Sequence, residues 1–111
     1  MTIATLRKHC LSLPGATHDV KWGNDHCYSI GGKMFAVFGP KNFSFKVDDN
    51  RFLELTDLEG IIPAPYMAKH KWVLVEDLKV LSDKDLRELL ARAHEIILAK
   101  APKKFRDALA K

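Results

Sequence analysis

The chain has 111 residues, of which 47% are hydrophobic and 29% charged, and a formal net charge of +4. These values are typical of one soluble globular domain, residues 1–111, that buries its own core. No apolar run approaches the roughly 18 residues of a membrane span, and the N-terminus does not resemble a signal peptide. We therefore expect a cytoplasmic protein without membrane contact.

The first half of the chain predicts one helix and three strands. Apolar residues at helical spacing follow Thr2, a predicted N-cap, at Ile3, Leu6, Cys10 and Leu13. The helix should end at Pro14-Gly15. We expect an irregular segment over 16–25, with Trp22 as a buried aromatic plug. The runs 26–30 and 33–38 flank Gly31-Gly32, which predicts a hairpin with a type I′ turn.

The third predicted strand, 43–47, alternates between apolar and polar residues. Its apolar positions, Phe43, Phe45 and Val47, should face the core, while Ser44 and Lys46 face water.

The second half predicts a short helix at 51–56, capped by residues 48–50, and a brief strand at 61–62. Trp72 to Val75 should form a fifth strand. Ser82 and Asp85 resemble a capping box that opens the longest helix, and Pro102 separates it from a last short helix. The order predicts an α+β fold with two layers, α-β(3)-α-β(2)-α. Its mostly antiparallel five-stranded sheet should have helices on one face and an open face opposite.

A series of short motifs occurs in a fixed order along nearly the whole chain. They are Leu11-Ser-Leu-Pro-Gly15, Trp22-Gly23, Gly31-Gly-Lys-Met-Phe35, Phe43-Ser-Phe-Lys46, Pro63-Ala-Pro-Tyr66 and Ala101-Pro-Lys-Lys104. This set resembles the MmcQ/YjbR-like family of small bacterial proteins. The resemblance implies a secretion-chaperone-like two-layer fold and DNA binding through a double-wing arrangement, with no established catalytic activity. Lys21 departs from the proline that the family often has before the aromatic-glycine pair.

Charge is distributed unevenly. The stretch 26–47 contains Lys33, Lys41 and Lys46 and no acid. On the hairpin turns and the wet face of the sheet these lysines could contact phosphates, which attract cations without reading sequence. The alternative is a solvated sheet face whose lysines protect its edges from aggregation.

The stretch 60–75 is also free of acids, and it combines aromatic with basic residues. Tyr66, Lys69, His70, Lys71 and Trp72 suit stacking on exposed bases together with phosphate contact. The alternative places both aromatics in the core and leaves only the basic residues exposed.

Potential metal ligands gather near the first turn of the sheet, at His18, Asp19, Asp25, His26 and Cys27. Their spacing fits no familiar zinc pattern, and strand alternation would place His26 and Cys27 on opposite faces. Cys10 and Cys27 are interpreted as reduced packing residues. We expect no metal, no cofactor and no catalytic residue, since the common nucleophile and phosphate-loop motifs are absent.

These observations favour a non-enzymatic domain that binds DNA through its basic sheet face and hairpin turns. The alternative is a domain for protein interaction, dimerisation or small-ligand binding. Both functions are compatible with a monomer or a weak homodimer.

Overall fold

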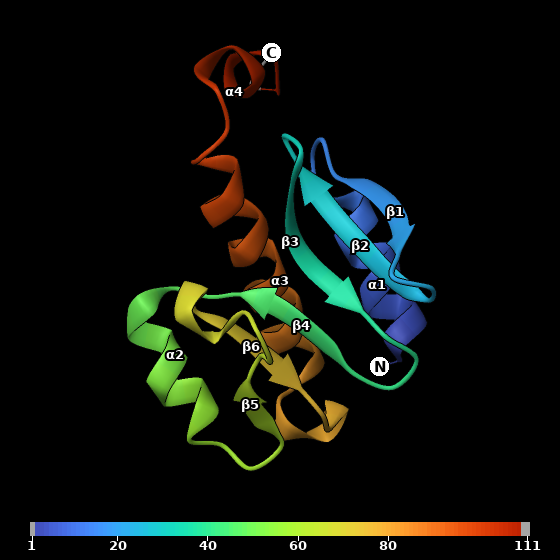
Figure 1. Cartoon of the computed structure of the whole chain (residues 1–111), viewed down its shortest axis with the longest axis vertical. Helices are drawn as coiled ribbons and strands as arrows, with labels where there is room; N and C mark the ends of the chain where they lie inside the picture. Colours follow the sequence, from blue (N-terminus) through green and yellow to red (C-terminus); the bar gives the residue numbers. More distant parts are fainter. Residues whose placement is uncertain (1, 110–111) are drawn as a thin grey trace.

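The computed structural model describes residues 2–109 and shows four α-helices beside one sheet (Figure 1). In chain order the elements are α1 (Ile3–Ser12), β1 (Thr17–Lys21), β2 (Asp25–Ile30), β3 (Lys33–Phe38), β4 (Phe43–Lys46), α2 (Asp49–Thr56), β5 (Ile61–Pro63), η1 (Ala68–His70), β6 (Trp72–Val75), η2 (Leu78–Val80), α3 (Asp83–Leu98) and α4 (Lys103–Leu109), where η1 and η2 are 3-10 helices. In this part of the chain no helix is long and apolar enough to cross a membrane.

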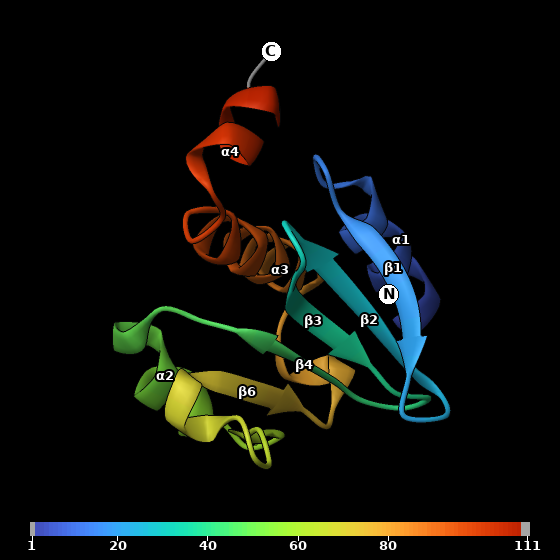
Figure 2. The same ribbon diagram turned by 45° about the horizontal axis from the view of Figure 1, so that its top comes forward.

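The sheet is antiparallel throughout, with the strand order β1-β2-β3-β4-β6-β5. Helices α1 and α3 lie behind the sheet in both views and pack on the same face, whereas α2 packs against β5 and β6 (Figures 1 and 2). Four phenylalanines from the two central strands, all fully buried, form the middle of the core: Phe35, Phe38, Phe43 and Phe45. The predicted two-layer α+β fold is therefore confirmed.

Strand register shows which side chains share a face. Phe45 pairs with Val73, both fully buried against the helices, and the adjacent pair Lys46 and Trp72 points to the other face. We call this other face the uncovered face, because among the described elements α1 and α3 both pack opposite it.

Local signals in the sequence are reproduced in the structure. Gly31 and Gly32 both have positive φ, 60° and 82°, as a type I′ hairpin turn requires. The Thr2 and Ser82 hydroxyls accept hydrogen bonds from backbone N–H groups three residues later, each at 3.1 Å. Helix α4 follows Pro102 as predicted.

The sheet has six strands rather than the predicted five. The additional strand is β1, in the segment that we expected to be irregular. All five of its residues are exposed, because it is an edge strand that pairs only with β2. An exposed edge strand needs no apolar alternation, so it leaves no periodic signal in the sequence.

Trp22 was also predicted wrongly. It lies in the turn between β1 and β2 with 69% of its surface exposed, and it is not a buried plug. Figure 2 shows the β1–β2 turn at an end of the sheet, and most of the Trp22 side chain there is left in solvent.

The two central strands separate at one end. Strand β3 pairs with β4 only from Ala36 to Phe38, so the beginning of β3 has no partner in β4. Strand β4 continues along β6 instead, where the Val47 N–H donates to the Lys71 carbonyl at 2.9 Å. Figure 2 shows β3 and β4 spreading apart at this end. Where the two strands separate, the end of α3 is reached from the uncovered face.

Candidate anion-binding cleft

A cleft of about 400 Å³ lies where β3 and β4 separate. It is lined by Lys21, Gly32, Lys33, Met34, Lys46, Met67, His70, Trp72, Ile97 and Lys100. We call it the cation cleft, since four lysines and one histidine face it and none of its described lining residues is acidic. The residues come from five separate parts of the chain, so the fold itself assembles the site.

Lys46 is the most enclosed cation of the cleft. We predicted that it faces water, but only 8% of its surface is exposed. Its Nζ donates hydrogen bonds to the carbonyls of His70, at 2.6 Å, and Val47, at 3.3 Å. The prediction failed because alternation identifies only the face of a strand. Here Met67 and His70, after β5, line one cleft with Lys46, and the end of α3 meets them where β3 and β4 separate.

The negative charge near Lys46 does not balance the effects that disfavour its charged form. Burial lowers the pKa of its ammonium group, nearby Lys100 lowers it further, and Asp48 and Asp49 offset only part of this. Neutral carbonyls satisfy the ammonium protons without neutralising the charge. An anion in the cleft would therefore stabilise the charged form of Lys46.

Trp72 forms a wall of the cleft with only 4% of its surface exposed. A ring buried to this extent cannot stack on a base, so its role is to hold the sheet together. Lys33 is exposed at the beginning of β3, and His70 is exposed at the end of η1. These two side chains can reach a ligand without any rearrangement of the core.

The other predicted residues lie outside the cleft. Lys41 is exposed in the turn between β3 and β4, at the opposite end of β3 from Lys33. Lys69 is exposed on η1, and the Lys71 Nζ lies 5.0 Å from the centre of the Phe52 ring. Tyr66 is wholly exposed. The structure thus brings together Lys33, Lys46, His70 and Trp72 from the predicted set of eight.

Lys21 and Lys100 line the cleft but were not among the predicted site residues. Lys100 follows the end of α3 and directly precedes the Ala101-Pro-Lys-Lys104 motif, which could have drawn attention to it. Lys21 has acidic neighbours, because Asp25 is its cross-strand partner and Asp19 is two residues away. The part of the cleft from Lys33 to Lys100 is accordingly the stronger anion site.

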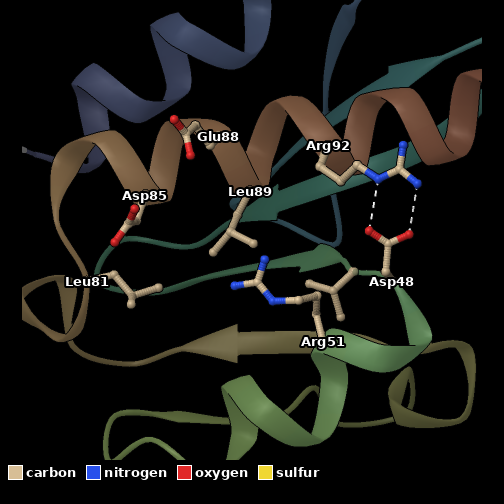
Figure 3. A pocket seen from close by; sticks show the side chains of 8 residues that line it. Asp48, Arg51, Leu81, Asp85, Glu88, Leu89 and Arg92 are labelled. Carbon is tan, nitrogen blue, oxygen red and sulfur yellow. Dashed lines mark hydrogen bonds and ion pairs between the residues drawn. The ribbon is translucent and has the colours of Figure 1, made fainter.

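A second cavity, of about 370 Å³, lies between α2 and α3 (Figure 3). Both of its arginines face carboxylates. The Arg92 guanidinium donates two hydrogen bonds to the Asp48 carboxylate, each at 2.9 Å, and the Arg51 Nε lies 3.3 Å from Glu54. Asp48 is the N-cap residue of α2, but its side chain binds Arg92 and makes no capping hydrogen bond. Both arginines of the α2–α3 cavity are therefore already paired with carboxylates of the chain itself.

The histidines that were considered as metal ligands lie on the helix-covered face. His26 Nδ1 is 2.8 Å from both the Arg7 guanidinium and His18 Nε2, so it must accept at least the arginine N–H. Burial, Arg7 and His18 together lower the pKa of His26. Residues 2–109 contain no group of three possible metal ligands.

Both cysteines are buried and unpaired. Burial raises the pKa of the Cys10 thiol to about 12 and also raises that of Cys27. A thiol with a raised pKa is a poor nucleophile at neutral pH. The geometry therefore offers binding groups in the cation cleft and no activated thiol among the described residues.

The fold recurs in solved structures. A Deinococcus radiodurans protein with a DUF419 domain is 26% identical, with a TM-score of 0.85 over 98% of this chain and 88% of that one. A Pseudomonas syringae protein is 19% identical, with a TM-score of 0.71 over 87% of this chain and 99% of that one. No curated protein matches. The YjbR family model matches residues 11–96, which is most of the chain, and we conclude that this protein belongs to the YjbR family.

Proposed function

We propose that this chain is a cytoplasmic, non-enzymatic nucleic-acid-binding domain that holds backbone phosphates in the cation cleft. The observation that carries the proposal is the convergence of Lys33, Lys46 and Lys100 on one cleft whose described lining has no acid. Phosphates would add counter-charge to the part that Asp48 and Asp49 already supply to Lys46.

The form of the cleft suits a chain of phosphates. The cleft is open to solvent and is not an enclosed cavity, so it can receive part of a longer polymer. Lys33 and Lys100 are exposed and can follow the backbone, whereas Lys46 is anchored on two carbonyls and offers a fixed positive charge. Lysine contacts of this kind bind phosphate without reading base sequence.

Salt dependence tests the proposal. We expect labelled DNA or RNA of about 20 nucleotides to bind at low salt, measured by fluorescence anisotropy. The logarithm of the affinity should fall with the logarithm of salt concentration, with a slope of about −3 to −5 for several lysine contacts. Absence of binding to duplex DNA, single-stranded DNA and RNA at low salt would refute the proposal.

A second candidate function is self-association through β1. This strand is an edge with every residue exposed, and Val20 leaves 47% of its surface in water. An unpaired strand edge can add a strand from another chain. Light scattering after size exclusion tests this candidate, since a Val20→Lys variant should shift a dimer toward the monomer. A monomer at high protein concentration would exclude it.

A further inference from the structure

We infer that the domain takes single-stranded nucleic acid, with Tyr66 as the side chain on which a base stacks next to the cation cleft. The inference rests on the proposed function and specifies its ligand. The supporting feature is a turn with a strained backbone whose aromatic residue, Tyr66, is fully exposed to solvent.

Tyr66 lies at the third position of the tight turn Ala64-Pro65-Tyr66-Met67. The Met67 N–H donates to the Ala64 carbonyl at 3.1 Å, which closes the turn. Pro65 occupies the second position, and Tyr66 has φ of 66°. These features are those of a type II turn, whose third position favours glycine because it needs positive φ. A tyrosine there carries a backbone strain that glycine would not.

The side chain gains nothing from the fold in return. Tyr66 is 100% exposed, so its ring buries no area against the protein. An aromatic residue that is both strained and unburied reduces stability without packing benefit. Strain of this kind concentrates at functional sites, and a ring held free in water is available to stack on a ligand.

The turn is fixed beside the cleft. Ala64 is buried, and its N–H donates to the Trp72 carbonyl at 3.0 Å. Met67, the residue after Tyr66, lines the cleft itself, and its carbonyl accepts the His70 N–H at 3.1 Å. The Tyr66 ring is therefore carried by a turn that is joined to two lining residues of the cation cleft, Met67 in the chain and Trp72 by a hydrogen bond. A phosphate in the cleft and a base on Tyr66 would belong to the same short stretch of strand.

Trp22 is a second exposed aromatic residue with positive φ. It has φ of 50°, it is 69% exposed, and it directly follows Lys21, a cleft residue. Two exposed aromatic residues with positive φ are thus each adjacent in the chain to a residue that lines the cleft. Interleaved aromatic rings and cations are the general means by which proteins bind unpaired strands.

Duplex binding by projecting hairpins fits the structure less well. The Gly31-Gly32 turn would be one such wing, but it packs against the C-terminal segment, where an added Cβ on Gly31 would lie 3.0 Å from Ala101. Phe105 also lies next to this turn. In addition, bases inside a duplex are already stacked and cannot stack on Tyr66.

The experiment compares three ligands of equal length by anisotropy at low salt. They are a 12-nucleotide oligo(dT), an abasic 12-mer with the same phosphates, and a 12-base-pair duplex. We expect oligo(dT) to bind about 5- to 100-fold more tightly than the abasic strand, because stacking is the only difference between them. A 12-nucleotide oligo(U) then shows whether DNA or RNA is preferred, and binding of either supports the inference.

Three variants connect the preference to the two rings. Tyr66→Gly should reduce the preference for oligo(dT) over the abasic strand while leaving the salt dependence unchanged. Its melting temperature should be no lower than that of the parent protein, because the turn is relieved of strain. Tyr66→Phe is the matched control and should keep the preference. Trp22→Asn should also reduce the preference for oligo(dT) over the abasic strand. Asparagine is chosen because it tolerates positive φ.

The outcomes separate the two proposals. If the parent protein binds oligo(dT) and abasic strands equally, or the duplex more tightly than either, the single-strand inference is wrong and phosphate binding stands. If none of the ligands binds, the proposed function is wrong as well. A melting temperature for Tyr66→Gly below that of the parent would contradict the strain argument.

Discussion

The cation cleft and the α2–α3 cavity have similar volumes, about 400 and about 370 Å³, and basic side chains line both. They differ in what those side chains contact. In the α2–α3 cavity Arg92 and Arg51 face the carboxylates of Asp48 and Glu54. In the cation cleft Lys46 contacts only carbonyl oxygens. Pairing with carboxylates, rather than the number of cations, therefore distinguishes a structural cavity from a candidate anion site.

The largest effect should come from removing two exposed cations of the cleft, Lys33 and Lys100. We expect the double variant Lys33→Gln/Lys100→Gln to lower affinity for nucleic acid about ten- to a hundredfold at low salt and to make the salt slope shallower by about 2. Anisotropy titrations at several salt concentrations measure both quantities.

The matched control is the double variant Lys8→Gln/Lys79→Gln. It removes the same charge from exposed positions on α1 and η2, outside the cleft. If the control lowers affinity as much as the cleft variant, then net charge and not the cleft determines binding.

The next largest effect concerns stability at the buried lysine. Lys46→Met keeps the length of the side chain but removes the hydrogen bonds to His70 and Val47. Unpaired buried carbonyls should reduce the free energy of unfolding by about 2 kcal/mol, measured in urea. Lys33→Met, at an exposed position, should change it by less than about 0.5 kcal/mol. Equal effects would show that Lys46 has no structural role.

A smaller and pH-dependent effect should appear in the α2–α3 cavity. The hydrogen bond from Arg92 holds the pKa of Asp48 below the ordinary value of an aspartate side chain. A lowered pKa in the folded state stabilises the protein above the pKa of the unfolded state, and this contribution is lost as pH falls through the folded value. Asp48→Asn should therefore be less stable than the parent at pH 7 and similar to it at the acid end of the titration. Urea unfolding at several pH values checks this, and a constant difference would contradict it.

The smallest effect is expected at Arg51. Its Nε is buried without a well-formed hydrogen bond, and its ion pair with Glu54 is largely exposed. Exposed pairs of this kind contribute little. Arg51→Met should change the free energy of unfolding by less than about 0.5 kcal/mol and leave nucleic-acid affinity unchanged. A marked loss of binding would move the candidate site to the α2–α3 cavity.

Local structure was largely predictable from the sequence, because its signals act over a few residues. Gly31-Gly32 determines a turn through the φ values that glycine tolerates, and Ser82 begins α3 through a hydrogen bond within one helical turn. Strand β1 lacked such a signal, since an exposed edge strand is stabilised by its partner's backbone and not by its own side chains.

The candidate site was predictable only in part. Lys33 and His70 were recognised from acid-free stretches, and both line the cleft. Lys100 lies 54 positions after Lys46 in the sequence, and only the end of α3 brings the two together. Trp22 was expected to be a buried plug and is exposed, whereas Trp72 takes the buried one of the two environments considered for it, because the type of residue does not say which neighbour will cover it.

Local periodicity and short motifs were enough to predict the two layers, the hairpin, most helix ends, the family, and the order of the helices and strands apart from β1. The tertiary structure alone decided which lysines share a cleft, that Lys46 is enclosed and that Tyr66 is exposed on a strained turn. The physical reason is that burial and charge pairing depend on contacts between residues far apart in the chain. Alternation shows which face a side chain occupies, and the rest of the fold decides what lies over it.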